Sequence, residues 1–325
     1  MKPVLNLYWG DPIIVREALT DTLRPYYFPS GPPLKDLGYP EHNGNPKLID
    51  QMKVLSERQS GHRPKHLFVT CGATGAINAA LHALKNHRTG WVVANKRFFP
   101  LYPQIISMAD MVMIDRDKKK FLTNKSNGCT EANFISLVDS PSNPEGSVCP
   151  LEGADIWDSA YASKTYSSSG HVPKKWKVSC GSLSKTLGLA GLRLGWISTD
   201  DSSLADSISS YITTHYAGLS SVSMKVAEDI LDTLDLHKFE VKSSGYLDDN
   251  RETMQRLLDR FGQGDVSPRG MFALLQLGKA ERKALVRANI KWLPGNMWGE
   301  DESWARLSLG QSREIVRAAV KGALK

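Results

Sequence analysis

The chain has 325 residues, enough for one large domain or two unequal ones, and its 41% hydrophobic and 23% charged residues are ordinary for a soluble globular protein. No apolar run approaches the roughly 20 residues of a membrane helix. The N-terminus lacks the apolar core of a signal peptide, so we expect a cytoplasmic protein that does not span a membrane. The net charge of +7 is mildly basic. No nucleic-acid-binding motif accompanies the lysine clusters at 118–120 and 174–177, which favours solvated turns over a nucleic-acid surface.

The cysteines indicate a reducing compartment rather than a disulfide framework or a metal centre. Cys71, Cys129, Cys149 and Cys180 form no C-x-x-C pair and have no zinc-ligand spacing. We therefore expect reduced thiols and no bound metal.

Helix and strand patterns alternate along the first two thirds of the chain. Residues 6–11 are predicted to be extended, and residues 24–44, rich in Pro, Gly and Tyr, to be irregular. Strands are predicted at 66–70, 91–94, 111–114, 134–139, 154–158, 176–181 and 194–197, and helices at 13–23, 46–59, 76–84 and up to about 109. This alternation indicates a mostly parallel α/β sheet, whose ligands bind at the carboxyl ends of the strands.

The pattern changes after about residue 201, where helices predominate before a mixed segment. Helices are predicted up to 216, at 223–234, 247–261 and 280–288, and up to 324, with strands at 271–277, 290–293 and 304–308. These elements indicate a smaller α+β domain at the C-terminus.

The segment from Ser182 to Trp196 holds the most informative residues. Lys185 stands alone among small, turn-forming residues, and Arg193 follows eight positions later. A lysine can lose its proton and attack a carbonyl to form an imine, whereas an arginine stays charged and holds a phosphate by two hydrogen bonds. Pyridoxal 5'-phosphate (PLP) carries an aldehyde and a phosphate on one ring and therefore suits both residues. For this segment alone, an exposed lysine on a glycine-rich loop is an open alternative.

A second feature is the turn at Gly72, Ala73 and Thr74, between a predicted strand and a predicted Ala-rich helix. A strand, a glycine-containing turn and a helix in succession direct backbone N–H groups and the positive end of the helix towards an anion. A plain strand-to-helix connection is the alternative for this segment.

Together with residues elsewhere, these features resemble the fold-type I PLP enzymes, the aspartate aminotransferase superfamily, over nearly the whole chain. The order and the spacing of the motifs agree at several separate places. The resemblance implies an α/β fold with an N-terminal arm at 1–30, a large PLP-binding domain with a mostly parallel sheet at 31–215, and a small C-terminal domain at 216–325.

The resemblance also assigns a cofactor site. Lys185 matches the Schiff-base lysine, and Asp158 with Tyr161 matches a D-x-x-Y pair, which completes the implied catalytic group. The other implied PLP contacts are Ser182 and Arg193 at the phosphate, the turn of Gly72, Ala73 and Thr74, Asn143 of an N-P-E-G turn, Phe99 against the ring, and Tyr39, which would reach the phosphate of a neighbouring subunit.

For the substrate, the resemblance assigns Arg306 to the α-carboxylate, with Asn143 and Gly10 beside it. A bidentate pair with Arg306 would orient the substrate Cα–H bond towards Lys185, which would act as general base and acid. An ionised Asp158 would keep the pyridine nitrogen protonated, so that the ring withdraws electrons from Cα. Taken singly, each residue has a structural alternative: Asp158 as a helix cap, Phe99 as core, Asn143 as a turn former and Arg306 in a surface salt bridge.

The chain departs from the family pattern between Asn143 and Asp158. Only 15 residues separate the two, and three prolines lie in or beside the interval, so a full crossover helix does not fit. This abbreviation looks similar to the alliinase and tryptophan-aminotransferase-related branch, whereas the Lys185 loop looks more like histidinol-phosphate aminotransferases. The two resemblances point to different substrates, so the amino-acid donor and the acceptor stay open.

We expect a PLP-dependent aminotransferase that moves the amino group of an L-amino acid to a 2-oxo acid. The alternative is a PLP-dependent C–S or β-eliminating lyase of the alliinase type, because both reactions start from the same carbanion at Cα. A non-enzymatic PLP-binding regulator or a nucleic-acid binder is less favoured, because Lys185, Asp158 and Arg306 are all present. Tyr39 implies a homodimer with shared active sites.

Overall fold

The computed structural model describes residues 4–8, 10–23, 38–85, 90–116, 134–148, 153–166 and 175–325. The lysine cluster at 118–120, most of the predicted irregular segment, Cys129 and Cys149 lie outside these residues, whereas Cys71 and Cys180 are free thiols within them. Across the described ranges, no three His, Cys, Asp or Glu side chains converge as a metal site would require. No helix in the same ranges is long and apolar enough to cross a membrane.

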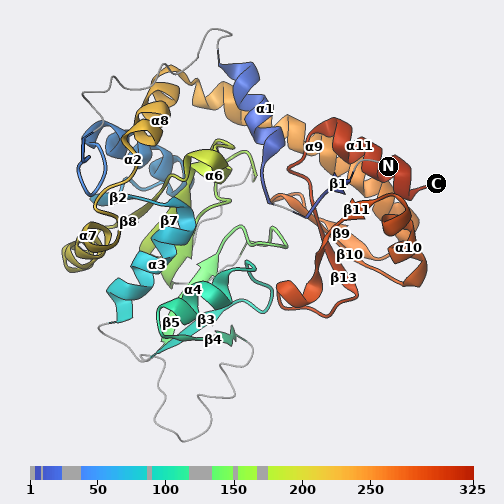
Figure 1. The fold of residues 1–325 in the computed structure, drawn as a ribbon, viewed down its shortest axis with the longest axis horizontal. Helices are drawn as coiled ribbons and strands as arrows, with labels where there is room; N and C mark the ends of the chain where they lie inside the picture. The colour runs from blue at the N-terminus through green and yellow to red at the C-terminus, as the bar shows by residue number, and fades with distance from the viewer. Residues whose placement is uncertain are drawn as a thin grey trace, which may run out of the picture.

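A seven-stranded sheet forms the centre of the larger part of the molecule (Figure 1). In spatial order its strands are β2 (His66–Thr70), β8 (Gly195–Thr199), β7 (Trp176–Ser182), β6 (Ala154–Asp158), β5 (Phe134–Asp139), β3 (Trp91–Ala94) and β4 (Val112–Asp115). The pairs from β7 to β4 are parallel, whereas β8 runs antiparallel to both β7 and β2. The mostly parallel sheet predicted from the sequence is therefore confirmed.

Helices cover this sheet on both faces. They are α2 (Pro46–Ser60), α3 (Gly72–Lys85), α4 (Tyr102–Met108) and α7 (Ser202–Tyr216). In β2, Phe68 belongs to the core that contains α3, α4 and α7, whereas Leu67 and Val69 belong to a second core with α2. This alternation follows from the strand period, because successive side chains point to opposite faces.

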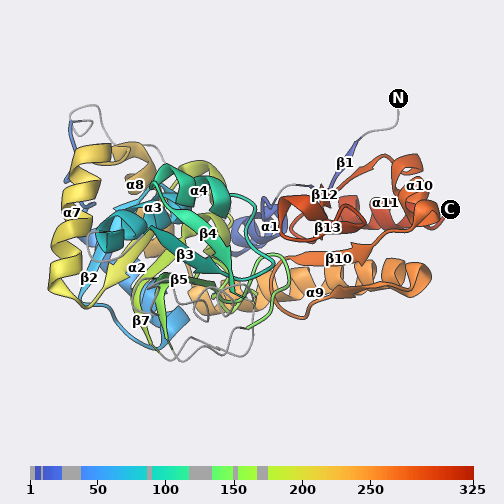
Figure 2. The same ribbon diagram turned by 90° about the horizontal axis from the view of Figure 1, so that it is seen from below.

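Residues 236–325, here called the C-terminal region, form a smaller α+β unit beside the sheet (Figure 2). Its four-stranded antiparallel sheet contains, in spatial order, β12 (Leu293–Pro294), β13 (Trp304–Ser308), β10 (Phe272–Gln276) and β9 (Gly264–Val266), and its helices are α9 (Leu236–Phe261), α10 (Lys279–Arg287) and α11 (Arg313–Ala323). Within this region, the 26-residue helix α9 begins beside the larger part of the molecule and extends away from it (Figures 1 and 2).

The N-terminal segment lies against the C-terminal region, although the two are far apart in the sequence. β1 (Leu5–Asn6) pairs in parallel with β11 (Ile290–Lys291), and α1 (Ile13–Thr22) packs along α9. By contrast, α8 (Ser221–Thr233) packs against α2 of the larger part. The division into an arm, a large domain and a small domain at 30 and 215 stays a prediction, because these contacts run across both boundaries.

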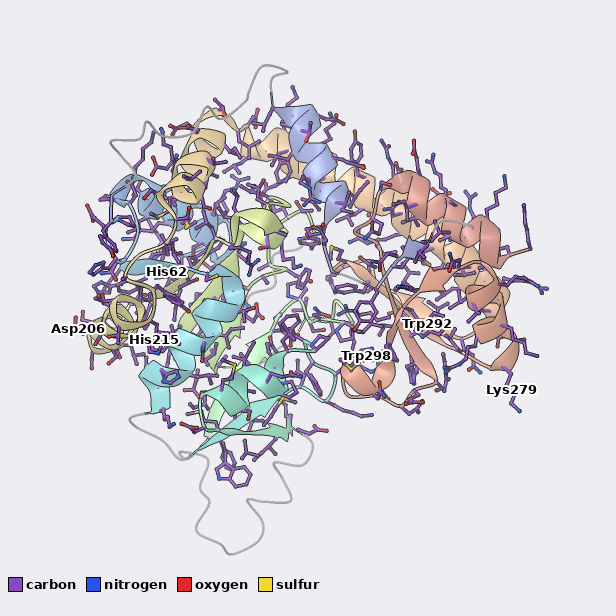
Figure 3. All side chains as sticks on the ribbon, in the orientation of Figure 1. His62, Asp206, His215, Lys279, Trp292 and Trp298 are labelled. Atoms are coloured by element: carbon purple, nitrogen blue, oxygen red, sulfur yellow. The ribbon has the colours of Figure 1, made fainter. Side chains whose placement is uncertain are left out.

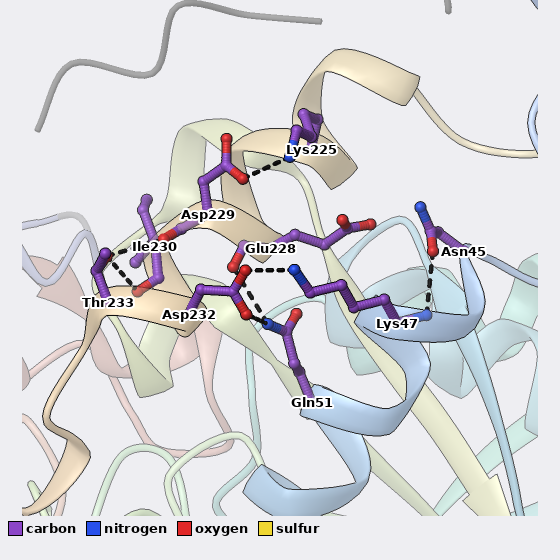
Figure 4. Close-up of polar contacts among 9 residues, drawn as sticks. All are labelled: Asn45, Lys47, Gln51, Lys225, Glu228, Asp229, Ile230, Asp232 and Thr233. Atoms are coloured by element: carbon purple, nitrogen blue, oxygen red, sulfur yellow. Dashed lines mark hydrogen bonds and ion pairs between the residues drawn. The ribbon is translucent and has the colours of Figure 1, made fainter.

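Polar contacts join α2 to α8 (Figure 4), and α8 lies against the segment 183–194, here called the lysine loop. Asp232 forms an ion pair with Lys47 and accepts a hydrogen bond of 2.8 Å from Gln51, which also donates to the carbonyl oxygen of Glu228 at 3.2 Å. Because the charged groups are exposed, the ion pair itself contributes little to stability. The contacts fix α8, which in turn packs against the 3₁₀ helix Ala190–Leu192 of the lysine loop.

Two helices begin at least four residues earlier than predicted. α3 begins at Gly72, so the predicted turn at 72–74 is the first turn of the helix. Its packing against β7 and β8 overrides the weak helix propensity of its two glycines. α9 begins at Leu236 rather than at 247, because the side chain of Asp235 accepts the backbone N–H of Lys238 and caps the helix.

The predicted strand at 290–293 is divided between two sheets. Lys291 pairs with Asn6, whereas Leu293 pairs with Arg306. The chain therefore changes sheets between these positions, which a local hydrophobic pattern does not indicate. The short polar strand β9 was not predicted, since its three residues lack an apolar pattern.

Candidate active site

A cavity of about 190 Å³ opens at the carboxyl ends of the parallel strands. Its lining comprises Gly72, Ala73, Thr74, Ile77, Phe99, Asp139, Asn143, Asp158, Ala160, Tyr161, Ser182, Ser184, Lys185, Ala190 and Arg193. Ten of the residues assigned from the sequence are in this group. Arg306 and Gly10 touch it through Asn143 and Lys185, respectively.

A wider surface depression of about 630 Å³ lies elsewhere, at the start of β7 and the end of antiparallel β8. One of its lining residues, His62, is labelled in Figure 3. The depression is at the amino-terminal edge of the parallel strands. Open α/β sheets bind their ligands at the opposite edge. The smaller cavity at Lys185 is therefore the candidate active site.

Lys185 lies in the short helix α6 (Leu183–Thr186), directly after β7. The Ser182 side chain caps this helix by accepting the backbone N–H of Ser184 at 3.1 Å, which fixes the turn that carries the lysine. The Lys185 ammonium donates a hydrogen bond to the carbonyl oxygen of Gly10. Burial, together with the positive charges of Arg306 and Arg193, lowers the pKa of Lys185 to about 8.

Asp158 ends β6 and is 7% exposed. Its Oδ2 accepts the hydroxyl of Tyr102 at 2.7 Å, and its Oδ1 accepts the backbone N–H of Ala160 at 3.0 Å. Burial raises the pKa of Asp158, while these two hydrogen bonds and the charge of Lys185 oppose the rise. No helix starts at Asp158, which removes the helix-cap alternative.

Backbone N–H groups and a cation meet at the other end of the cavity. Gly72 begins the 14-residue helix α3 with a φ of +69°, and Arg193 has a φ of +55° directly after the 3₁₀ helix. A Cβ added at Gly72 would lie 3.0 Å from Nη2 of Arg193. The helix N-terminus and the guanidinium therefore face one small space that suits an anion.

Arg306 lies in β13 and is only 4% exposed. Its Nη1 donates to Oδ1 of Asn143 at 2.8 Å, and its Nη2 donates to the carbonyl oxygen of Tyr8 at 3.3 Å. The guanidinium carbon lies 4.0 Å from the centre of the Phe272 ring. Burial lowers the pKa of Arg306 to about 10, and its Nε has no hydrogen-bond partner in the described part of the chain. A buried cation with an unused donor is not a surface salt bridge.

Aromatic rings form the walls around Lys185 and Asp158. Phe99 lines the cavity and makes an edge-to-face contact with Tyr102, with ring centres 5.5 Å apart. Tyr161 is 5% exposed and contacts Phe272 edge to face, and the Lys185 nitrogen lies 5.9 Å from its ring centre. Burial raises the pKa of Tyr161, so its hydroxyl stays protonated at neutral pH.

Arg97 joins the Asn143 turn to the C-terminal region. Its Nε donates to Glu300 at 2.7 Å and its Nη1 to Glu145 at 2.5 Å, while its guanidinium lies 5.0 Å from the centre of a Trp304 ring. Trp298, buried where the C-terminal region faces the larger part (Figure 3), is 5.9 Å from the same cation. The half-buried Arg97 therefore connects the loop after β3, the turn after β5 and the C-terminal region.

Tyr39 is the one assigned residue that stands apart. It is 92% exposed and does not line the cavity of its own chain. Its neighbours Gly38 and Pro40 contact Ser221 and Gly218, at the start of α8. A role for Tyr39 in the site of a second subunit stays a prediction.

Sequence reasoning missed three polar residues of the site. Asp139 lines the cavity, Asn95 donates to its carboxylate, and Tyr102 donates to Asp158. A usable signal existed for Asp139, because it ends a predicted strand as Asp158 does. Tyr102 follows Phe99 by three residues, at the start of α4, and Asn95 directly follows β3, so the strand-end signal applies to Asn95 as well.

A family model described as aminotransferase class I and II matches residues 34–322. The chain belongs to this family. It is 26% identical over 278 residues to tryptophan aminotransferase-related protein 2 of Arabidopsis thaliana, covering 77% of this chain and 59% of that protein. It is 25% identical over 324 residues to a bifunctional aspartate aminotransferase and glutamate/aspartate-prephenate aminotransferase of Petunia hybrida, covering 83% of this chain and 65% of that protein. The chain thus spans less than two thirds of either relative.

Solved structures support the fold. An aromatic aminotransferase from Pyrococcus horikoshii matches with a TM-score of 0.76 at 16% identity, covering 99% of this chain and 95% of that one. A mutant aspartate aminotransferase from Thermus thermophilus matches with a TM-score of 0.75 at 17% identity, covering 98% and 90%. The fold is accordingly that of the aspartate aminotransferase-like, fold-type I enzymes.

The family uses PLP, and PLP is the cofactor that follows for this chain. The residues present fit it. The end of the cavity lined by Gly72 and Arg193 suits a phosphate, Lys185 has the lowered pKa that an amine needs to attack an aldehyde, and the buried Asp158 can face a ring nitrogen.

Proposed function

We propose that this chain is a PLP-dependent aminotransferase that transfers the amino group of an L-amino acid to a 2-oxo acid, with Lys185 as the residue that binds the cofactor covalently. The observation that carries the proposal is the meeting of three groups at one cavity. A lysine on α6 with a pKa of about 8 and a buried aspartate at the end of β6 line it, and a buried arginine of β13 with an unused donor reaches it through Asn143.

The cofactor would be held at three points. Ser182, Arg193 and the N-terminus of α3 would bind the phosphate, Asp158 would pair with the ring nitrogen, and Phe99 would lie against the ring. Asn143 and Tyr161 would donate hydrogen bonds to the phenolic oxygen. When bound, PLP supplies an aldehyde that condenses with amines and a ring that withdraws electrons from the substrate Cα.

Lys185 would move the proton at the substrate Cα. A lysine with a pKa of about 8 is neutral in a useful fraction of molecules near neutral pH, whereas an exposed lysine is almost wholly protonated. The Gly10 carbonyl accepts a hydrogen bond from its nitrogen and so fixes the direction from which it acts. Asp158, when ionised, would hold a positive charge at the ring nitrogen opposite.

Arg306 would bind the α-carboxylate of the amino acid. Its Nε is buried and has no partner among the described residues, and a carboxylate would satisfy that donor in a bidentate pair. Asn143, Tyr8 and the Phe272 ring hold the guanidinium from other sides. This arrangement would orient the substrate before any proton moves.

The proposed assembly is a homodimer in which Tyr39 completes the phosphate site of the partner subunit, and the proposed location is the cytoplasm. The high exposure of Tyr39 supports the first point, since a large aromatic side chain on a free surface is suited to an interface. The proposed small-molecule partners are an L-amino acid and a 2-oxo acid.

The test is the visible absorbance of the purified protein with PLP, before and after single L-amino acids are added. L-tryptophan, L-aspartate and L-glutamate are included because the names of the relatives mention these classes. Loss of the yellow band with a subset of amino acids, and its return with a 2-oxo acid, supports transamination. Release of pyruvate from cysteine-type substrates with a persistent band supports a β-eliminating lyase instead. A band that is the same in Lys185→Ala as in the wild type contradicts the proposal.

A further inference from the structure

A second buried carboxyl lies beside Asp158 at the floor of the cavity. Asp139 is the last residue of β5, and it pairs in register with Asp158, the last residue of β6. Asp139 is 3% exposed and lines the cavity. The matches that assigned the site from the sequence include Asp158 but give no role to Asp139.

Both carboxylate oxygens of Asp139 are engaged by neighbouring loops. Oδ1 accepts the side-chain amide of Asn95 at 3.0 Å, and Oδ2 accepts the backbone N–H of Asn143 at 2.8 Å. Asn95 directly follows β3, and Asn143 lies in the turn that follows β5. Asp139 therefore connects two loops at the carboxyl edge of the sheet by hydrogen bonds.

Through Asn143, this hydrogen-bonded connection extends to the C-terminal region. The Oδ1 atom of Asn143 accepts Nη1 of Arg306 at 2.8 Å, across 163 residues of sequence. The backbone of Asn143 is thus held by Asp139, while its side chain holds the arginine. If the backbone N–H lost its acceptor, the turn would be free to rotate the carboxamide away from Arg306.

The placement of Asp139 is electrostatically unfavourable, so its carboxyl group does more than fill space in the core. Burial and the negative charge of Asp158 raise the pKa of Asp139 to about 7, against the hydrogen bonds from Asn143 and Asn95. Tyr102, on α4, also faces both carboxyls. An apolar residue of similar size would avoid this cost, so the two acceptor oxygens are the feature that the position requires.

We propose that Asp139 is a positioning residue that, through Asn143, holds Arg306 in the orientation needed to bind the substrate carboxylate. This inference rests on the proposed function, in which Arg306 binds that carboxylate. It assigns Asp139 no contact with the cofactor. The substitution of its acceptor oxygens should therefore weaken carboxylate binding without weakening PLP binding.

The test compares Asp139→Leu, which removes both acceptors at similar volume, with Asp139→Asn, which keeps one acceptor oxygen for the Asn143 N–H and replaces the charge and the other oxygen by an NH2 group. Asp155→Leu is the matched control, because Asp155 is a buried carboxyl on β6 that also accepts a backbone N–H, from Ser136 at 2.9 Å, but does not line the cavity. The dissociation constants for PLP and then for succinate and 3-phenylpropionate, carboxylates without an amino group, are measured by calorimetry on each PLP-loaded protein.

We expect Asp139→Leu to weaken carboxylate binding about tenfold, as the loss of a well-made hydrogen bond to a charged group implies, while PLP binding changes less than about twofold. Asp139→Asn should recover most of the carboxylate affinity, and Asp155→Leu should leave both constants unchanged. In an Asn143→Ala background, Asp139→Leu should add little further loss, because its route to Arg306 is already broken.

The inference is overturned by equal losses in PLP and carboxylate binding, by no rescue in Asp139→Asn, or by an undiminished effect in the Asn143→Ala background. Where Asp139→Leu does not fold, Asp139→Ala serves the same comparison. A wild-type protein that binds PLP and carboxylates normally, with no loss in either Asp139 variant, overturns this inference alone. A wild-type protein that does not bind PLP overturns the proposed function with it.

Discussion

The side-chain nitrogen of Lys185 donates a hydrogen bond to the carbonyl oxygen of Gly10, which lies 175 residues earlier in the chain. The N-terminal segment is therefore part of the candidate active site. It is fastened nearby, because Arg16 pairs with Asp11 at 3.0 Å and donates to the carbonyl oxygen of Gly188 in the lysine loop at 2.7 Å. A Cβ at Gly188 would lie 2.6 Å from the backbone nitrogen of Arg16, so this approach needs glycine.

The lowered pKa of Lys185 predicts how PLP uptake depends on pH. Only the neutral amine attacks an aldehyde, so the rate of PLP uptake by the cofactor-free protein should rise with pH, with a midpoint at about 8. Arg306→Gln removes a positive charge that helps to lower this pKa and should move the midpoint upwards. Stopped-flow absorbance over pH 6 to 10 measures both, and a midpoint near the ordinary lysine value of about 10.4 would contradict the buried environment.

The anion site predicts an effect of Gly72→Ala that Gly61→Ala does not share. Both glycines have a φ near +70°, but a Cβ meets Nη2 of Arg193 at Gly72 and nothing within 4 Å at Gly61. Each substitution should cost about 1–2 kcal/mol of stability for the left-handed backbone. Only Gly72→Ala should also weaken the binding of PLP and of inorganic phosphate. Absorbance titration measures the first directly and the second by competition with PLP. Equal weakening in both variants would mean that backbone strain alone is responsible.

Arg306→Lys tests the need for a two-pronged carboxylate contact. Lysine keeps the charge but cannot replace the planar guanidinium over Phe272 or its bond to Asn143. We expect the KM for the amino acid to rise by about 10- to 100-fold, while the affinity for PLP stays the same. Steady-state kinetics and absorbance titration separate the two, and an unchanged KM would remove Arg306 from substrate binding.

The proposed shared active sites predict complementation between two defective subunits. The Lys185→Ala chain should have little activity at any PLP concentration. The Tyr39→Ala chain should have reduced activity when PLP is limiting. After they are mixed, dissociated and allowed to reassociate, hybrid dimers contain one site with both native residues. Activity should therefore reappear on mixing. Light scattering checks the assembly, and a monomer in solution or a mixture with no gain in activity speaks against a role for Tyr39 in the partner subunit.

The stability of the cofactor-free protein should reflect the buried Asp139. Its pKa of about 7 lies above the value of 3.8 for an unperturbed aspartate, so the folded chain binds this proton more tightly than the unfolded chain. The contribution of this group to stability is then complete below pH 4 and is lost as the pH rises through 7. Asp139→Asn cannot ionise, so its stability relative to the wild type should improve from pH 5 to pH 8. Urea unfolding at both pH values measures the difference, and a pH-independent difference would show that Asp139 does not titrate in this range.

Much of the fold follows from local patterns in the sequence. The strands at 66–70, 91–94, 134–139, 154–158 and 304–308 have the predicted bounds, because short apolar runs between turn residues leave few other conformations. Most of the residues that line the cavity were also assigned from the sequence through the family resemblance, and several of them, such as Asp158, lie at or just after the end of a strand. A parallel sheet brings those ends to one edge whatever the order of its strands.

The partners of Asp139, Lys185 and Arg306 could not be predicted in the same way. The register of β5 and β6 places Asp139 beside Asp158, and the meeting of β13 with the turn after β5 places Arg306 on Asn143. Local patterns set whether a residue is in a strand, a helix or a turn. Which side chains touch depends on how distant segments pack, and that is a property of the whole core.

By itself, the sequence determined the type of most elements and indicated residues able to hold PLP, because backbone preferences and side-chain chemistry act locally. Only the tertiary structure decided that Gly10 reaches Lys185, that α1 packs along α9, and that Asp139 supports Asn143. These contacts join segments that are distant in the chain. Their free energy comes from burying both partners together, so neither segment alone carries the signal.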